Sequence, residues 1–367
     1  MTDSKQPLRV LIAGGGTGGH LYPGLAVAEA LRVQSPGIEI RFAGSKRGLE
    51  AREIPRHGYR LHTIPVRGLF GVSAWRRLVG FSLLPLAFVK SLWVLLTFRP
   101  HLVLGVGGYA SGPILGTALL LRLRCALQEQ NASPGITNRL LGRFVHQAFL
   151  TVPVTHQIFP RSIVTGNPVR RDILALRNAP PAPGNGGLPL QIFVLGGSLG
   201  ARAINQAMTQ ALPLLAKSPH PPRILHQTGR LDIDWVSQAY SAASLEARVT
   251  PYLDDMAKAY RESALVVSRA GASAIGEIIT AKKPSVLIPI PGTSGEHQLR
   301  NAQRLAHAGA AILIPQSELT PALLAESLLS LLNDASRLSA MIKAADDLFP
   351  GDSAKQIAAE CLKLIRE

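Results

Sequence analysis

Several residue types are scarce in this 367-residue sequence, and each scarcity excludes a class of protein. Only two cysteines occur, Cys125 and Cys361, and they lie too far apart to form the short spacing of a structural metal site. This usage indicates buried thiols in a reducing compartment and excludes a disulfide-rich secreted fold. Aromatic residues make up 5%, and no motif of a DNA- or RNA-binding module accompanies them, so we expect no nucleic-acid partner.

Acidic residues are few in the first half of the chain. Residues 1–171 contain 6 Asp/Glu against 21 Lys/Arg, a net charge of +15, whereas residues 172–367 contain 17 against 18, a net charge of +1. A basic half favours a polyanionic partner, either nucleic acid or an anionic membrane surface, although it can also be a solvated basic surface. Because nucleic-acid motifs are missing, the anionic membrane is the partner that we expect.

The sequence has no uninterrupted hydrophobic run of membrane-spanning length. Residues 81–98 come nearest, but Pro85 and Lys90 interrupt them, and a charge at the centre of a spanning helix costs about 2.5–3.5 kcal/mol. The N-terminal apolar run, residues 8–13, is too short for a signal peptide. We therefore expect a buried helix, or a helix whose apolar face touches a bilayer. The residues that suit the second alternative are Trp75, Arg76, Arg77, Val79, Phe81, Lys90 and Trp93.

Short strand-like runs alternate with helical patterns along the whole chain. Rich in Val, Ile and Leu, they read "RVLIA", "IEIRFAG", "LVLGVGG", "QIFVLGG", "RILHQTG", "ALVVSRAG" and "SVLIPIP". Apolar strands separated by helices are typical of parallel sheets built from βαβ units. The pattern predicts an α/β fold with two domains, over residues 1–166 and 167–350, and an exposed Pro/Gly-rich loop or linker at residues 178–189.

Two strand–glycine–helix units stand at residues 8–31 and 190–212. In the first, Gly14, Gly16 and Gly19 satisfy Gly-x-Gly-x-x-Gly, the first part of the dinucleotide-binding fingerprint. The fingerprint also needs an acidic residue at the end of the second strand to bind the ribose. That strand is followed here by glycine, serine and cations, so the sequence disfavours an NAD-dependent enzyme.

Two further glycine-containing loops follow predicted strands, at residues 105–113 and 268–277. Backbone N–H groups in such loops can approach a ligand, and the next helix directs its positive pole at an anion. A single loop of this kind often only turns the chain, but four predict a ligand crevice between two domains. Asp232-x-Asp234 is too weak to predict a metal site, and neither a P-loop nor a Gly-x-Ser-x-Gly elbow occurs.

Eight motifs follow one another in a specific order between residues 8 and 365. They are "GGTGGHLYPGLAVAEAL", "GVGGYASGP", "EQNASPGITNR", "TGNPVR", "LGGSLGAR", "PYLDDMAKAY", "SRAGASAIGE" and "HQLRNA". In this order they resemble the MurG family of N-acetylglucosaminyltransferases. The resemblance implies a GT-B glycosyltransferase architecture, in which two Rossmann-like domains face each other across a cleft. It also implies that the last helix, about residues 351–367, packs back onto the first domain.

The resemblance implies inverting transfer of GlcNAc from UDP-GlcNAc to the MurNAc 4-hydroxyl of lipid I, undecaprenyl-pyrophosphoryl-MurNAc-pentapeptide, giving lipid II for peptidoglycan synthesis. The first domain would face the acceptor and the membrane, and the second would bind UDP-GlcNAc. No cofactor and no metal are implied. Glu277 would hold the ribose hydroxyls, and the Leu253 backbone would contact the uracil. The donor contacts implied are Thr17, Gly18, Gly19, Asn131, Arg170, Ser198, Leu253, Ala272, Ser273, Ala274, Ile275, Gly276, Glu277 and Gln298.

His20 is the candidate general base, because a helix start favours a neutral imidazole that can accept a proton. A positioning or capping role is the alternative. Tyr109 is a second candidate on the acceptor side. The chain departs from the family at Gln128, where a histidine is common. Glutamine cannot shuttle a proton, so we expect an altered contact at that position and not a lost activity.

A diphosphate lipid acceptor in an anionic leaflet fits the basic first half of the chain. We expect peripheral association with the cytoplasmic face of the bacterial cell membrane, and other cell-wall enzymes as further partners. Another GT-B transferase, for instance one that glycosylates diacylglycerol, is the alternative enzyme. A nucleic-acid-binding module is the alternative without catalysis.

Overall fold

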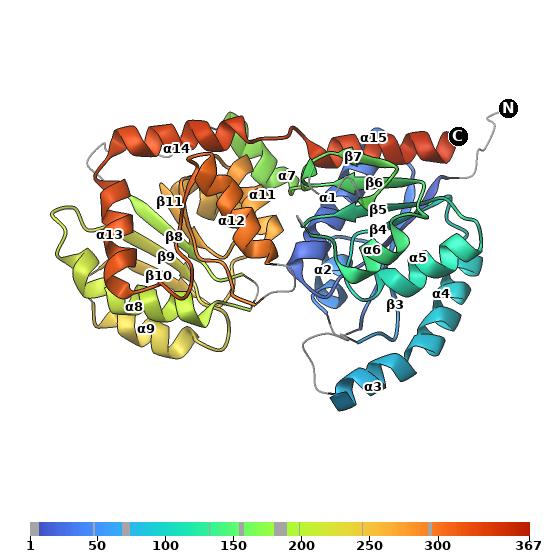
Figure 1. Cartoon of the computed structure of the whole chain (residues 1–367), viewed down its shortest axis with the longest axis horizontal. Helices are drawn as coiled ribbons and strands as arrows, with labels where there is room; N and C mark the ends of the chain where they lie inside the picture. The colour runs from blue at the N-terminus through green and yellow to red at the C-terminus, as the bar shows by residue number, and fades with distance from the viewer. Residues whose placement is uncertain are drawn as a thin grey trace. The chain divides into compact units, whose positions relative to one another are not determined.

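The chain divides into two compact units (Figure 1). Unit 1 comprises Met1–Arg170 and Pro350–Glu367, and unit 2 comprises Arg171–Phe349. The unit boundary lies four residues beyond the predicted one. The structure is a computed structural model, and it describes residues 7–46, 48–67, 74–131, 133–153, 158–179, 189–197, 199–243, 245–292 and 296–367.

Unit 1 contains a parallel sheet with the order β3-β2-β1-β4-β5-β6-β7. Its strands are β1 (Arg9–Ala13), β2 (Glu39–Gly44), β3 (Arg60–Thr63), β4 (Leu102–Gly105), β5 (Cys125–Glu129), β6 (Gln147–Leu150) and β7 (Ser162–Val164). Its helices are α1 (Gly18–Gln34), α2 (Glu50–Arg56), α3 (Ala74–Ser82), α4 (Leu84–Phe98), α5 (Ser111–Leu120), α6 (Ile136–Leu141) and α15 (Ser353–Arg366).

Unit 2 contains a second parallel sheet with the order β10-β9-β8-β11-β12-β13. Its strands are β8 (Gln191–Leu195), β9 (Arg223–Gln227), β10 (Ala247–Thr250), β11 (Leu265–Ser268), β12 (Ser285–Leu287) and β13 (Ala311–Leu313). Its helices are α7 (Arg171–Leu174), η2 (Ala175–Asn178), α8 (Arg202–Ala216), α9 (Ile233–Ser241), α10 (Met256–Glu262), α11 (Ala272–Thr280), α12 (His297–His307), α13 (Pro321–Leu332) and α14 (Ala335–Asp347).

Two parallel-sheet α/β units confirm the fold class predicted from the sequence. Central strands such as β4 and β5 are buried along their whole length, because helices cover both faces of the sheet. In each sheet the strand order reverses once, between β1 and β4 in unit 1 and between β8 and β11 in unit 2. Ligands of open α/β sheets bind beyond the carboxyl ends of the strands at such a reversal, so these two places are the candidate sites.

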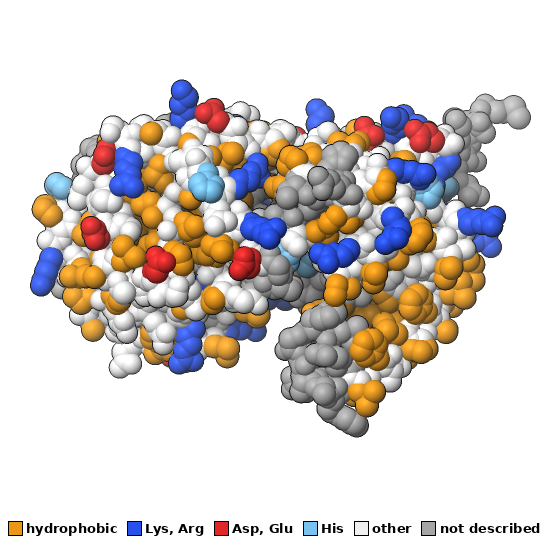
Figure 2. Space-filling model, viewed as in Figure 1, with side chains coloured by type: hydrophobic (Ala, Val, Ile, Leu, Met, Phe, Trp, Pro, Cys, Tyr) orange, Lys and Arg blue, Asp and Glu red, His pale blue; other side chains and the backbone are white. Residues whose placement is uncertain are grey.

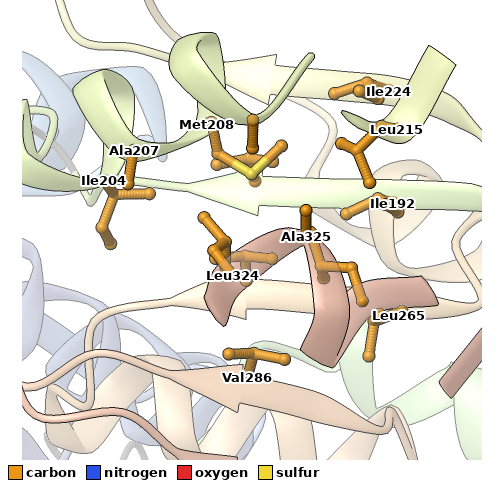
Figure 3. Close-up of a cluster of buried hydrophobic side chains, with 14 of the residues drawn as sticks. Ile192, Ile204, Ala207, Met208, Leu215, Ile224, Leu265, Val286, Leu324 and Ala325 are labelled. Atoms are coloured by element: carbon orange, nitrogen blue, oxygen red, sulfur yellow. The ribbon is translucent and has the colours of Figure 1, made fainter. Parts of the chain in front are cut away.

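Each core follows from the alternation of side chains along the central strands. In unit 2, Ile192 of β8, Met208 of α8 and Leu324 of α13 meet in one buried cluster (Figure 3). On the opposite face of the same sheet, the ring of Phe193 contacts Tyr260 of α10 edge to face at 5.5 Å. In unit 1, α15 packs against α1 and buries its apolar stripe in the same cluster as β1.

Candidate functional site

The first glycine loop joins β1 to α1 in unit 1. Gly15 and Gly16 adopt φ values of +136° and +95°, which only glycine reaches without strain. The Gly14 amide donates to the Ala43 carbonyl at 3.0 Å, the Gly15 amide to the Gly107 carbonyl at 3.3 Å, and the Gly16 amide to Glu50 Oε2 at 2.8 Å. All three amides are engaged within the protein. The sequence analysis predicted that the glycine amides of this loop bind an anion. That prediction is wrong for Gly14, Gly15 and Gly16, because their amides already donate to acceptors within the protein.

The loop after β4 lies directly against the first glycine loop. Gly107 and Gly108 have φ values of +90° and +83°. A Cβ atom on Gly108 would overlap the Gly15 carbonyl oxygen, and one on Gly107 would overlap the imidazole of His20. The predicted loops at residues 14–16 and 105–113 therefore interlock at the β1/β4 reversal. Tyr109, on the same loop, is 46% exposed and stands beside them.

His20 occupies the first turn of α1 and is half-buried. Its Nδ1 lies 3.2 Å from the hydroxyl of Thr17, the N-cap residue, which therefore does not cap the helix with its side chain. Burial lowers the pKa of His20 to about 4, and the opposing charge of Glu50 raises it. The imidazole is neutral at pH 7 and can accept a proton. The sequence analysis attributed a neutral His20 to the helix dipole. In the structure, desolvation of the ring is the largest cause of its lowered pKa.

Gln128 belongs to a buried amide chain and is fully inaccessible to solvent. The Gln130 Nε2 donates to Gln128 Oε1 and to the Val106 carbonyl, and Gln128 Nε2 donates to Asn167 Oδ1 at 3.3 Å. Asn167 belongs to the "TGNPVR" motif. Glutamine at 128 thus ties the β4 loop to the end of β7, a positioning role that requires no proton transfer.

Glu129 anchors the loop that carries Asn131. Its Oε1 accepts from the Asn131 amide at 2.9 Å, and its Oε2 accepts from Asn138 Nδ2 at 2.9 Å and the Gly135 amide at 3.1 Å. Burial raises the pKa of this carboxyl, although the four N–H donors around it oppose that shift. Asn131, a predicted donor contact, is therefore positioned by a carboxylate that the sequence analysis did not single out.

Arg170, predicted to contact the donor, ends unit 1. Its guanidinium lies 4.7 Å from the ring centroid of Tyr22 on α1. A Cβ atom on Gly18 would meet the same ring at 3.2 Å. Four predicted donor residues, Thr17, Gly18, Gly19 and Arg170, therefore gather around the first turns of α1. Tyr22 is a further member that the sequence analysis missed.

The second glycine loop joins β8 to α8 in unit 2, and Ser198 in it lies outside the described residues. Gly200 and Gly229 both have φ of +82° and interlock, since a Cβ atom on either would overlap the backbone of the other loop. The side-chain amide of Asn205 stabilises this arrangement through hydrogen bonds. Its Nδ2 donates to the Thr228 carbonyl and to Asp232 Oδ2, both at 2.9 Å, and its Oδ1 lies 3.0 Å from His226 Nε2.

The predicted uridine and ribose contacts lie after β10 and β11. Gly271 is the N-cap of α11, and Ala272, Ser273, Ala274, Ile275, Gly276 and Glu277 follow in its first two turns. Glu277 is 7% exposed, and its Oε2 accepts from the Tyr260 hydroxyl at 3.2 Å. Gln298, in the first turn of α12, accepts the Ile290 amide at 3.1 Å, and Leu253 is half-buried in the β10–α10 loop.

The helices after the glycine loops lack a side-chain cap, as do α2, α5, α9 and several other described helices. α1, α8 and α11 have no side-chain cap, whereas Asp255, Thr320, Asp334 and Asp352 each accept a backbone amide at the start of α10, α13, α14 and α15. Helices without a side-chain cap at the strand ends are suited to bind an anion.

Asp232 of the Asp-x-Asp pair is 6% exposed and is engaged by Asn205. Within the described ranges, no group of three or more His, Cys, Asp or Glu side chains could hold a metal ion. The structure thus assigns Asp232 to support of the second glycine loop.

The exposed face of α4 in unit 1 is hydrophobic (Figure 2). Ala87, Val94 and Phe98 pack into the core, while the opposite face is exposed. By length and composition alone, Leu78–Phe98 could cross a membrane. Of the predicted interfacial side chains, Trp75, Arg76 and Arg77 are not described, and Lys90 Nζ lies 4.0 Å from the Trp93 ring centroid. We define the α4 apolar face as Leu86, Phe88, Val89, Leu92, Trp93 and Leu96.

Two family models match the chain. The glycosyltransferase family 28 N-terminal domain matches residues 10–150, and the family 28 C-terminal domain matches residues 191–360. The chain is 42% identical over 361 residues to a relative from Anaeromyxobacter dehalogenans (strain 2CP-C), covering 98% of this chain and 94% of that one. A relative from Myxococcus xanthus (strain DK1622) is 41% identical over 362 residues, covering 98% and 93%. Both are named UDP-N-acetylglucosamine–N-acetylmuramyl-(pentapeptide) pyrophosphoryl-undecaprenol N-acetylglucosamine transferase.

Solved structures agree with these matches. The crystal structure of Acinetobacter baumannii MurG superposes with a TM-score of 0.74 at 30% identity, covering 97% of this chain and all of that one. The calicheamicin glycosyltransferase CalG4 gives a TM-score of 0.70 at 14% identity, which shows a shared fold alone.

Proposed function

The chain belongs to glycosyltransferase family 28, and we propose that it acts as a MurG-type N-acetylglucosaminyltransferase. It transfers GlcNAc from UDP-GlcNAc to lipid I and so forms lipid II for peptidoglycan synthesis. The observation that carries this assignment is the similarity to the named transferases over nearly the whole length of both chains. The two parallel-sheet units are of the GT-B class.

The neutral His20 supplies the base in the proposed chemistry. The MurNAc 4-hydroxyl attacks C1 of GlcNAc, the bond from C1 to the diphosphate oxygen breaks, and the configuration at C1 inverts. His20 takes the hydroxyl proton through Nε2, because Nδ1 faces the Thr17 hydroxyl. In this proposal Tyr109 contacts the acceptor, and its exposure on the adjoining loop supports that role.

Charge that develops on the departing UDP is stabilised by the helix start of α11. Glu277 binds the ribose of UDP-GlcNAc. The Leu253 backbone and Gln298 contact its uracil and its sugar. Unit 1 adds Thr17, Gly18, Gly19, Asn131 and Arg170 to the donor contacts, and Ser198 belongs to the same proposal. No step requires a metal ion or a cofactor.

The experiment that tests this function measures UDP release with UDP-GlcNAc and a soluble lipid I analogue. We expect turnover with that acceptor and none with diacylglycerol, the acceptor of the alternative transferase. Calorimetric titration should show binding of UDP and UDP-GlcNAc and no binding of NADH. Turnover with diacylglycerol alone, or NADH binding without UDP binding, would contradict the assignment.

We further propose that the α4 apolar face rests on the anionic cytoplasmic leaflet and that the enzyme is a peripheral membrane protein. Only 28% of the apolar window within Leu78–Phe98 is buried, and the basic side chain of Lys90 accompanies it, as expected for an interfacial helix. The net charge of +15 over residues 1–171 favours the same surface. Other cell-wall enzymes are a further class of predicted partner.

Replacing Leu96, which is 56% exposed on this face, with glutamate should weaken binding to phosphatidylglycerol vesicles by about tenfold or more. Burying a leucine contributes about 1.5–3 kcal/mol, and the new carboxylate is repelled by the leaflet. Flotation at low salt measures the bound fraction. Leu231→Glu is the matched control, because Leu231 is a 92% exposed leucine of unit 2. Equal binding of both variants would refute the proposed contact surface.

A further inference from the structure

Glu50, the first residue of α2, is a buried carboxylate at the β1/β4 reversal with 1% of its surface exposed. Its Oε2 accepts the Gly16 amide at 2.8 Å. Its Oε1 accepts the Ser45 amide at 2.8 Å and the Ser45 hydroxyl at 2.7 Å. Short hydrogen bonds from three donors to two oxygens are the arrangement that compensates the desolvation of a buried carboxylate.

The glycines around Glu50 leave the space that its side chain fills. A Cβ atom on Gly15 would lie 2.5 Å from the Glu50 Cδ, one on Gly44 would lie 2.8 Å from its Cγ, and one on Gly48 would overlap its Oε2. The first glycine loop, the end of β2 and the start of α2 therefore close around one carboxylate. Some of the glycines in these loops provide space for Glu50 and not for a ligand.

A short chain of contacts leads from Glu50 to the base. The carboxylate holds the Gly16 amide, Thr17 follows as the N-cap of α1, and the Thr17 hydroxyl contacts His20 Nδ1. Glu50 is also the charged group whose field acts on His20. Thr17 from α1 and Gly107 from the β4 loop also lie against the ring, and both are uncharged.

We propose that Glu50 is a positioning residue for the glycosyl transfer. It fixes the first glycine loop, and thereby Thr17 and His20, and its negative charge stabilises the imidazolium formed when His20 takes the acceptor proton. This inference rests on the proposed role of His20 as the base. It assigns Glu50 no contact with either substrate.

Two variants separate the two parts of this role. Glu50→Gln keeps the size and an acceptor oxygen but removes the charge, and Glu50→Asp keeps the charge but shortens the reach to Gly16 and Ser45. We expect Glu50→Gln to lower kcat by roughly tenfold with the affinity for UDP-GlcNAc unchanged. The acidic limb of its pH–rate profile should move to lower pH, because loss of the negative charge lowers the pKa of His20 further. Glu50→Asp should lower kcat while the limb keeps its position.

Glu53→Gln is the matched control, since Glu53 is a buried carboxylate on the same helix that instead pairs with Arg52 and Arg56. It should leave kcat and the pH profile unchanged. In a His20→Ala background, Glu50→Gln should change kcat by less than twofold, because the two residues act as one unit.

The outcomes distinguish this inference from the function on which it rests. If His20→Ala is inactive while Glu50→Gln behaves like the wild type, only the role of Glu50 is overturned. If His20→Ala is active, both roles fall. Additive effects of the two substitutions, or a loss of UDP-GlcNAc affinity in Glu50→Gln, would also overturn the role of Glu50. If Glu50→Gln does not fold, the test rests on Glu50→Asp. A Glu50→Asp variant with wild-type kcat would then overturn the role of Glu50.

Discussion

Replacing His20 with alanine should lower kcat by roughly 10²–10⁴-fold, the contribution that a positioned general base makes to a proton transfer. The structure supports an effect of this size because His20 is neutral at working pH and packs between Thr17 and Gly107. The affinity for UDP-GlcNAc should stay within about twofold of the wild type, because loss of a base leaves ground-state binding intact. Steady-state kinetics and calorimetry with UDP-GlcNAc measure the two quantities.

His57→Ala is the control for this substitution. His57 follows α2 in the same unit and is partly exposed, with its Nδ1 3.8 Å from Glu29 Oε1. Its replacement should leave turnover unchanged. Near-normal turnover of His20→Ala would leave His20 with the alternative role, that of orienting the start of α1, and another residue would then have to accept the proton.

Replacing Glu277 with alanine should weaken UDP-GlcNAc binding by about 10- to 100-fold, since hydrogen bonds to a charged group contribute about 1.5–3 kcal/mol. Turnover at saturating donor should change far less, because the ribose does not take part in bond making or breaking. Calorimetric titration with UDP-GlcNAc measures the loss, and a thermal melt verifies that the buried site tolerates the change.

Tyr260→Phe separates ribose binding from support of the carboxylate. The Tyr260 hydroxyl donates to Glu277 Oε2 at 3.2 Å, so the variant removes this donor and keeps the carboxylate. Its affinity should remain within severalfold of the wild type. If Tyr260→Phe loses as much affinity as Glu277→Ala, the carboxylate acts through the tyrosine and the proposed ribose contact is wrong.

The sequence was informative wherever a pattern was local. The seven predicted strand runs correspond to β1, β2, β4, β8, β9, β11 and β12. The strands missed among the described residues are shorter or less apolar. Three of them, β3, β7 and β10, are edge strands with exposed or half-buried side chains. Their sequences therefore lack the hydrophobic run by which a strand is recognised.

Contacts across many residues could not be predicted in the same way. The sequence interpretation placed no acid at the end of β2, yet Glu50 returns from α2 to bind Ser45 at that end and Gly16 across 34 positions. With both oxygens engaged and 1% exposed, it is not placed to bind a ribose. The role of Gln128 was equally hidden, because its partner Asn167 lies 39 residues away.

The return of α15 to unit 1 also fixes the order in which the nascent protein can be completed. Unit 2 is one continuous stretch of chain, whereas unit 1 needs α15, which is synthesised after all of unit 2. Until α15 arrives, the surface of α1 and β1 that Ile357, Cys361 and Ile365 cover is open to water. A ribosome-bound chain therefore passes through a stage at which the second unit can already fold while the first still presents an apolar surface to chaperones or to aggregation.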